Sequence, residues 1–287
     1  MSLMPLYQQQ SRMVFEKLSR EVAKLANKPV PENVHRFRIY SRRVETVIDD
    51  LIAQPRRNQR KLLKLLGRLR KKAGRVRDLD VQISALRTLR IPQDPARKSQ
   101  LMRSLVEERA RRERKLPKLF NGSTVEELRK RVKRAARSLE IAPEASPVAL
   151  AIHKISALGA DQVSVTEKTL HQYRIAGKRA RYLAELGEKT PEAVQVIKQL
   201  KRLQDTLGDW HDWLQLTASA EELFAGVQES AIVSALRNIS RVKFRQGVNE
   251  LTELRASLIA PKAVEEPSAP APKPSARAVA RATAAVA

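Results

Sequence analysis

The chain has 287 residues, of which 56 are lysine or arginine and 31 are aspartate or glutamate, so its formal net charge is +25. An excess of one sign this large repels itself in a compact fold and indicates a polyanionic partner. The absence of cysteine excludes disulfide bonds and thiolate chemistry and is typical of a reducing compartment. The sequence shows neither a signal peptide nor the ~18 to 20 consecutive apolar residues that span a bilayer, so we expect a cytoplasmic protein without a membrane partner.

Helices account for the apolar pattern along most of the chain. Leucine, valine and alanine recur at spacings of three and four, and glycine occurs only 9 times, which predicts an all-α fold. Proline and glycine collect at the breaks between the predicted helices, and these breaks are 27–31, 91–95, 121–124, 143–147 and 190–191. We expect Asn33 to cap the helix after the first break, and Ser123 or Thr124 to cap the helix after the third.

The composition changes at about residue 259. From there on, proline, alanine and serine replace the periodic pattern, and such a segment buries too little apolar surface to order itself. The sequence therefore predicts a helical domain over 1–258 and a disordered tail over 259–287. The tail carries a net charge of only +2, so we expect the polyanion site on the helices.

One polar pattern occurs twice. The segment His35–Arg43 reads His-x-x-Arg-x-x-x-basic-basic, and the same pattern recurs 136 residues later in 171–179. On a helix with about 100° per residue, Arg38 and Arg42 lie within about 60° of His35, opposite the apolar side. A repeated core helix would repeat its apolar residues. The recurrence of polar residues predicts two copies of a site.

The second copy presents the same row of side chains, because Arg174 and Lys178 lie beside His171 on its helix. A further correspondence follows each copy, since 63–69 resembles 197–203 at an offset of 134 residues. Two helices of each half therefore repeat in the sequence.

Basic residues form a stripe on the first of these later helices. The stripe covers about 100° of arc and runs for about 27 Å, opposite a leucine face. Its members are Arg57, Lys61, Lys64, Arg68, Lys71, Lys72 and Arg75. The second half has only Lys198, Lys201 and Arg202, followed by Asp205 and Asp209. We therefore expect stronger anion binding by the first half.

These motifs resemble the CHAD domain, the conserved histidine α-helical domain. The likeness is carried by the two histidine patterns, by Arg77-Asp78-Leu79-Asp80, and by Leu203-Gln204-Asp205-x-Leu207-Gly208. The resemblance implies two antiparallel helical bundles related by an approximate two-fold axis, with halves at about 9–140 and 145–258. It also implies a basic central groove or pore that binds inorganic polyphosphate, often at polyphosphate granules. Family members frequently accompany a triphosphate-cleaving CYTH-type domain, whose Glu-x-Glu-x-Lys pattern does not occur in this chain.

The resemblance and the stripe together give the candidate polyphosphate-binding residues. They are His35, Arg38, Arg42, Arg43, Lys61, Lys64, Arg68, Lys71, Arg75, His171, Arg174, Lys178, Arg179, Arg181, Lys198 and Arg202. Arginine offers phosphate a bidentate fork, and lysine a point charge. A nearby phosphate favours protonated histidine, so binding is expected to be tighter at mildly acidic pH.

The acidic and aromatic residues near these motifs have other interpretations. Asp78, Asp80 and Asp212 are interpreted as ion-pair partners and the two tryptophans as core, so no metal ligand, cofactor or catalytic residue is predicted. The cations between Arg109 and Lys118 point all around a continuous helix and are interpreted as general surface charge, although they could extend the groove.

The alternative function is nucleic-acid binding, which the low aromatic content of 4% disfavours. A phosphohydrolase or phosphotransferase role is less favoured, because the repeated face lacks the carboxylates that would hold Mg²⁺. The sequence leaves the oligomeric state open.

Overall fold

A computed structural model describes residues 4–141, 145–158, 165–226 and 230–259. Within these ranges the chain forms helices and no strand, which confirms the predicted all-α class. The helices are α1 (Leu6–Asn27), α2 (Pro31–Leu51), α3 (Arg57–Thr88), α4 (Pro95–Glu113), α5 (Leu116–Leu119), α6 (Gly122–Arg137), α7 (Pro147–Ser156), α8 (Glu167–Ala184), α9 (Pro191–Leu223) and α10 (Ala231–Ile259). α10 extends one residue into the predicted tail, and the rest of the tail, 260–287, lies outside the described residues. None of the helices in the described ranges is long and apolar enough to cross a bilayer.

Proline marks the start of five of the described helices, because its fixed φ suits the first turn and its missing N–H is not needed there. α2, α4, α7 and α9 each begin with proline at the predicted breaks. Both predicted caps on the early helices were wrong. Asn33 lies inside the first turn of α2, where its Nδ2 donates to Lys28 O at 2.8 Å. The cap of α6 is Asn121, whose Oδ1 accepts from Thr124 N at 2.9 Å.

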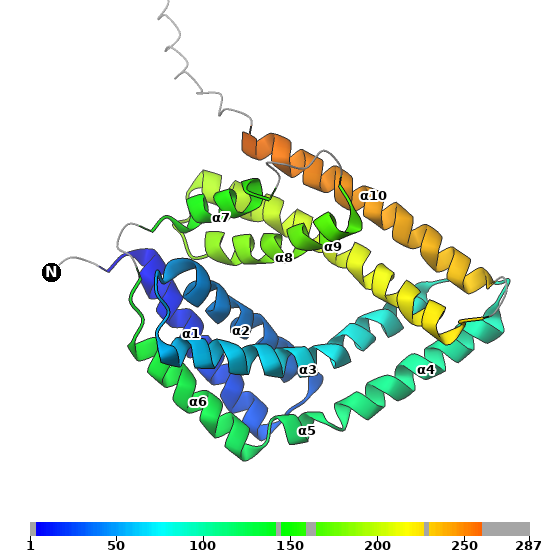
Figure 1. The fold of residues 1–287 in the computed structure, drawn as a ribbon, viewed down its shortest axis with the longest axis horizontal. Coiled ribbons are helices and arrows are strands. Elements are labelled where there is room, and N and C mark those ends of the chain that lie inside the picture. Colours follow the sequence, from blue (N-terminus) through cyan, green and yellow to red (C-terminus); the bar gives the residue numbers. More distant parts are fainter. Residues whose placement is uncertain (1–3, 142–144, 159–164, 227–229, 260–287) are drawn as a thin grey trace, which may run out of the picture.

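The helices form two bundles (Figure 1). α1, α2, α3 and α6 pack together in the first bundle, and α7, α8, α9 and α10 in the second. The bundles meet where α2 packs against α8 and α3 against α9. The two helices that carry the repeated histidine pattern are therefore brought face to face.

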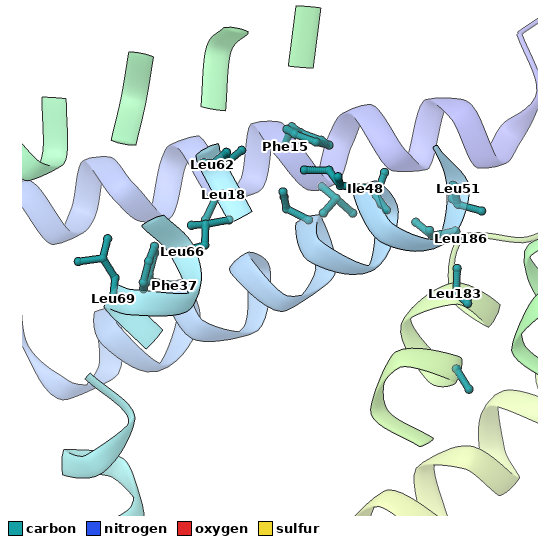
Figure 2. Close-up of a cluster of buried hydrophobic side chains, with 14 of the residues drawn as sticks. Phe15, Leu18, Phe37, Ile48, Leu51, Leu62, Leu66, Leu69, Leu183 and Leu186 are labelled. Atoms are coloured by element: carbon teal, nitrogen blue, oxygen red, sulfur yellow. The ribbon is translucent and has the colours of Figure 1, made fainter. Parts of the chain in front are cut away.

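One hydrophobic core runs through both bundles and fixes this arrangement. In the first bundle Phe15, Phe37 and Leu66 are almost completely buried. Figure 2 shows Leu51 at the end of α2 near Leu186 of the second bundle, and both belong to the same buried cluster. A fully buried leucine contributes about 1.5–3 kcal/mol, so shared burial holds the bundles together.

A second, smaller core lies where the far ends of the α3–α4 and α9–α10 pairs meet. It consists of Leu79, Ile83, Leu86, Ile91, Leu101, Leu105, Leu216, Ala220, Phe224, Ile232, Val233 and Leu236. Beside it, Ser219 Oγ donates to Gln82 Oε1 at 3.1 Å, which links α9 to α3. The two bundles are thus joined at two separate places.

Ion pairs across the first junction are reciprocal. Arg43 of α2 pairs with Glu185 just after α8 at 2.5 Å, and Arg179 of α8 pairs with Asp49 of α2 at 3.2 Å. Arg179 and Glu185 lie 136 residues beyond Arg43 and Asp49. An approximate two-fold axis requires this exchange of roles. The pairs accord with such an axis, and the internal duplication stays a prediction.

Candidate functional site

Four cations from the two histidine-bearing helices converge at the bundle junction. Arg38 and Arg42 come from α2, and Arg174 and Lys178 from α8. α2 packs against α8. Burial lowers the pKa of both Arg174 and Lys178, and the positive charges of Arg42 and Arg38 across this contact lower it further. We call these four residues the central cluster.

Arg38 is held in place by α3. Its Nη1 donates to Gly74 O at 3.1 Å, and its Nη2 lies 3.6 Å from Asp78 Oδ1. A Cβ on Gly74 would lie 3.0 Å from Nη2 of Arg38, so the guanidinium in this position favours a glycine. The interpretation of Asp78 as an ion-pair partner is confirmed, and so is that of Asp80, which pairs with Arg109.

Among the described cations, Lys178 has the most strongly lowered pKa. Burial, followed by the positive charges of Arg174 and Arg42, lowers the pKa of Lys178 to about 7. Asp212 opposes this change, but its own pKa is raised, chiefly by burial. The junction therefore contains more positive charge than its own acids neutralise, and an added anion would lower the electrostatic energy of the cluster.

Three histidines lie at or beside the cluster. Burial and the charges of Arg174 and Lys178 lower the pKa of His171, and burial together with Arg77 and Arg38 lowers the pKa of His35. His211 of α9 lies with its ring centroid 5.2 Å from that of His171.

His211 is the least basic of the three, because burial and Arg174 lower the pKa of its imidazole to about 3. The sequence analysis assigns His211 no role. A bound anion would raise the pKa of these imidazoles and draw protons to the site.

One donor atom of the central cluster is unpartnered. Arg174 Nε is buried and has no hydrogen-bond partner among the described residues. Buried polar groups in proteins are nearly always hydrogen-bonded. A phosphate oxygen would be a suitable partner, because arginine N–H groups form strong charge-assisted bonds to it.

The structure places three other candidate cations outside the cluster. Arg43 pairs with Glu185 and its guanidinium lies 4.9 Å from the centre of the Tyr182 ring. Arg179 pairs with Asp49 and Asp50, and Arg181 with Glu185. Their charges are already neutralised at the contact between the bundles. A structural role accounts for these three arginines.

The stripe on α3 is exposed and lacks acidic partners. Lys61, Lys64, Arg68, Lys71 and Arg75 are solvent-exposed, and none forms an ion pair within the described part of the chain. Asp78 lies on the same helix close to this arc, so the stripe ends beside the Asp78–Arg38 pair. The α3 stripe and the central cluster are adjoining parts of one basic surface.

The equivalent positions of the second half differ. Arg202 Nη2 lies 3.0 Å from Glu250 and 3.2 Å from Glu253 of α10, whereas Lys198 is exposed and forms no ion pair with the residues that the structure describes. Lys243 pairs with Asp209 nearby. The second half therefore has fewer cations at these positions, and acidic side chains neutralise part of them.

A cationic pocket lies at the corner where α3 meets α4, α5 and α6. We call it the corner pocket, and its volume is about 630 Å³. Its walls are Arg68, Leu69, Lys72, Arg75, Arg112, Lys115, Leu116, Lys118, Leu119 and Thr124. The cations of α4 and α5 in this wall were interpreted from the sequence as general surface charge. They gather instead around one cavity.

A second cavity of about 680 Å³ lies between α3, α4 and α9, and we call it the central cavity. Asp78 and Gln82 of α3 and Ser219 of α9 are on its wall. Arg75 and Arg112 line both cavities. The corner pocket and the central cavity therefore follow one another along α3, and Asp78, the partner of Arg38, is on the wall of the central cavity. Within the described ranges, no group of three or more metal-ligating side chains is arranged to hold an ion.

Fold and site together define a class, namely an all-helical protein whose two bundles bring unneutralised cations to their junction. The chain belongs to the CHAD domain family, since residues 11–221 match the CHAD domain. Comparison with curated protein sequences gives no match.

Solved structures show the same fold. The crystal structure of the CHAD domain from the plant Ricinus communis is similar with a TM-score of 0.64 and 19% identity, over 92% of this chain and 95% of that chain. PptA from Streptomyces chartreusis is similar with a TM-score of 0.58 and 15% identity, over 88% of this chain and 97% of that chain. At these identities the similarity concerns the fold.

Proposed function

We propose that this protein binds inorganic polyphosphate without cleaving it, and that it does so in the cytoplasm at polyphosphate granules. The observation that carries the proposal is the central cluster, in which burial and the positive charges of Arg42 and Arg38 lower the pKa of Arg174 and Lys178, and the opposing charge of Asp212 does not compensate. Membership in the CHAD domain family supports the choice of polymer, because the family is associated with polyphosphate binding.

The chemistry of the polymer suits this surface. Polyphosphate has a high density of negative charge and no bases, so recognition depends on the spacing of charges and on hydrogen-bond donors. Arg38, Arg42 and Arg174 supply donors at the junction, and the α3 stripe supplies further cations along about 27 Å. The affinity would come largely from the release of counterions and would fall steeply with salt, by analogy with nucleic acids.

A competition experiment tests the polymer. We expect the full-length protein to bind labelled polyphosphate of about 100 units at about 0.15 M salt, and to retain it against duplex DNA of equal total charge. Displacement of the polymer by the DNA would replace this proposal with a nucleic-acid-binding function.

The absence of cleavage is tested separately. The protein is incubated with polyphosphate and Mg²⁺ or Mn²⁺, and free phosphate is measured over time. We expect no release above the protein-free control, because the central cluster presents arginine and lysine in place of the carboxylates that hold catalytic metal ions. Release of phosphate at a rate proportional to protein concentration would make the protein an enzyme.

A further inference from the structure

An apolar groove lies at the far end of the α3–α4 pair, between the turn after α3 and the helix α4. We call it the α3–α4 groove, and its volume is about 710 Å³. Its apolar side chains are Ile91, Pro92, Pro95, Met102 and Val106. Val106 is 42% exposed, although it is apolar. Exposed apolar side chains that gather in a groove are typical of an interaction site.

The α3–α4 groove is separate from the central cavity, because it lies on another face of α4. Leu101 and Leu105 belong to the second core and line the central cavity. Met102 and Val106 follow them by one position, which is about 100° further around the helix. The fold therefore covers one apolar ridge of α4 and leaves the next one open.

The turn that forms one wall of the groove is held in a fixed position. Ile91 and Asp94 are buried, and Ile91 belongs to the second core. Lys98 Nζ donates to Leu89 O, and Arg97 pairs with Asp94, so both contacts tie α4 to the turn. The groove is a preformed feature of the fold.

Cations without acidic partners surround this apolar floor. Arg90, Lys98 and Arg103 line the groove, and none of them forms an ion pair within the described residues. No acidic side chain of the described chain lines the groove. Its occupant should therefore combine apolar side chains with negative charge.

A smaller cavity of about 370 Å³ continues the groove along α3, since Val106 lines both. Arg87 lines this cavity and forms no ion pair among the residues that the structure describes. The acid in its wall is Asp80, which Arg109 already neutralises. The excess of positive charge thus extends along the whole groove.

These features favour one kind of occupant. Inorganic polyphosphate has no apolar atoms and would leave the floor uncovered. A second copy of this chain carries the same net charge of +25 and would be repelled. An amphipathic helix with acidic residues beside its apolar stripe matches both the floor and the cations. The distance from Pro95 to Val106 is about 16 Å along α4, which about 11 residues of such a helix would span.

We propose that the α3–α4 groove docks an acidic amphipathic helix of a partner protein while polyphosphate occupies the central cluster. Gly74, which contacts Arg38, and Thr88 at the end of α3 are fourteen residues apart, or about 21 Å along the axis. This separation exceeds the Debye length of about 8 Å at physiological salt, so helix and polymer bind independently. The docking site goes beyond the proposed function and does not depend on it.

A designed peptide probes the apolar floor. The labelled peptide has about 18 residues, with leucines at positions i, i+3, i+4 and i+7 and glutamates at most of the others. A control peptide of the same composition has a scrambled order and no apolar stripe. Fluorescence anisotropy with the full-length protein measures binding. We expect the amphipathic peptide to bind at least about tenfold more tightly than the scrambled one, because only its leucines can cover the floor.

A matched pair of variants places the peptide in the groove. Val106→Asp adds an acid to the floor, and Val242→Asp adds one to α10, where Val242 is 50% exposed and does not line the groove. Both variants have the same net charge. Val106→Asp should weaken peptide binding about tenfold, because like charges then meet across the interface. Val242→Asp should bind within about twofold of wild type, since only the net charge changes.

A second pair of variants tests the cations of the groove. Arg90→Gln/Arg103→Gln should weaken peptide binding about fivefold and reduce its salt dependence. The control is Lys17→Gln/Lys133→Gln, which removes two exposed lysines of α1 and α6 that form no ion pair within the described ranges and do not line the groove. The control should bind the peptide like the wild type. Circular dichroism and thermal unfolding of each variant check the fold.

Four outcomes would overturn the docking site. These are equal binding of the two peptides, equal effects of Val106→Asp and Val242→Asp, displacement of the peptide by polyphosphate, and loss in Val106→Asp of binding to phosphatidylglycerol vesicles without any binding of the peptide. The last would make the groove a membrane contact. Failure of the protein to bind polyphosphate would instead overturn the proposed function and leave the peptide measurements unchanged.

Discussion

Arg42 and Arg43 are neighbours in the chain, yet they belong to two different regions of the bundle junction. Arg42 points into the central cluster, where its charge lowers the pKa of Lys178. Arg43 points to the contact between the bundles, where Glu185 neutralises it and Tyr182 lies beside it. The same residue type on one helix therefore serves binding on one side and assembly on the other. Whether an acid is present decides between the two roles.

The largest effect is expected from removing charge in the central cluster. Arg42→Gln/Lys178→Gln should weaken polyphosphate binding at least about 100-fold, because each lost charge-assisted hydrogen bond contributes about 1.5–3 kcal/mol. Calorimetry at fixed salt measures the loss. The Lys17→Gln/Lys133→Gln variant is the control and should bind like the wild type. A loss of similar size in that control would show that only the net charge of the protein matters.

The pH dependence of binding tests the same cluster. The pKa of Lys178 is about 7 in the free protein, and a bound anion raises it again, so binding above this pH takes up a proton. The affinity should therefore fall about tenfold between pH 6 and pH 8 at constant salt. Arg38, Arg42, Arg174 and Asp212 face Lys178.

The histidines act in the same direction, because the pKa values of His35 and His171 are lowered in the free protein and would rise in the complex. Lys178→Gln should remove most of the pH dependence and leave the smaller part due to His35 and His171. Equal affinity of the wild type at pH 6 and pH 8 would contradict a titrating role for all three groups.

The two halves of the protein also differ in whether acids neutralise their cations. Lys64→Gln/Arg68→Gln removes unpaired cations of α3 and should weaken binding about tenfold. Lys198→Gln/Arg202→Gln should change it less than about threefold, because Glu250 and Glu253 already neutralise Arg202. The two variants have the same net charge, so each is the control for the other. Equal effects would show that both halves contribute alike.

The smallest effect is expected at the bundle contact. Arg43→Gln should lower the free energy of unfolding by about 1 kcal/mol, since the pair with Glu185 is only partly exposed. The affinity of this variant for polyphosphate should stay within about twofold of wild type, because Glu185 already neutralises the charge that is removed. Denaturant titration and calorimetry provide the two values. A loss of binding without a loss of stability would show that Arg43 belongs to the binding site.

Helical periodicity predicts the central row correctly. Arg38, Arg42, Arg174 and Lys178 were placed beside the histidines from angles alone, and the structure brings these four together. The same angles place Arg43 about 80° from His35, off the row. The family pattern nevertheless added it to the candidates. Helical periodicity therefore predicts the direction of the Arg43 side chain better than the family motif does.

The corner pocket could not be predicted from periodicity, because the helix does not continue. α4 ends at Glu113, and α5 begins at Leu116 with Pro117 in its first turn. Helical angles that assume one continuous helix therefore predict that the cations of 109–118 point in all directions. Pro117 was the available signal, since proline marks a new helix start more readily than it fits an interior.

The reciprocal ion pairs have a consequence for how the two halves can change. In a dimer of identical chains, one substitution would remove Arg43–Glu185 and its symmetric counterpart together. Here both halves lie in one chain, so Arg179–Asp49 survives the loss of Glu185. Each half can diverge one side chain at a time while the other keeps the contact. His211 beside His171 stands where the first half has Arg77, and this difference is of the kind that such freedom allows.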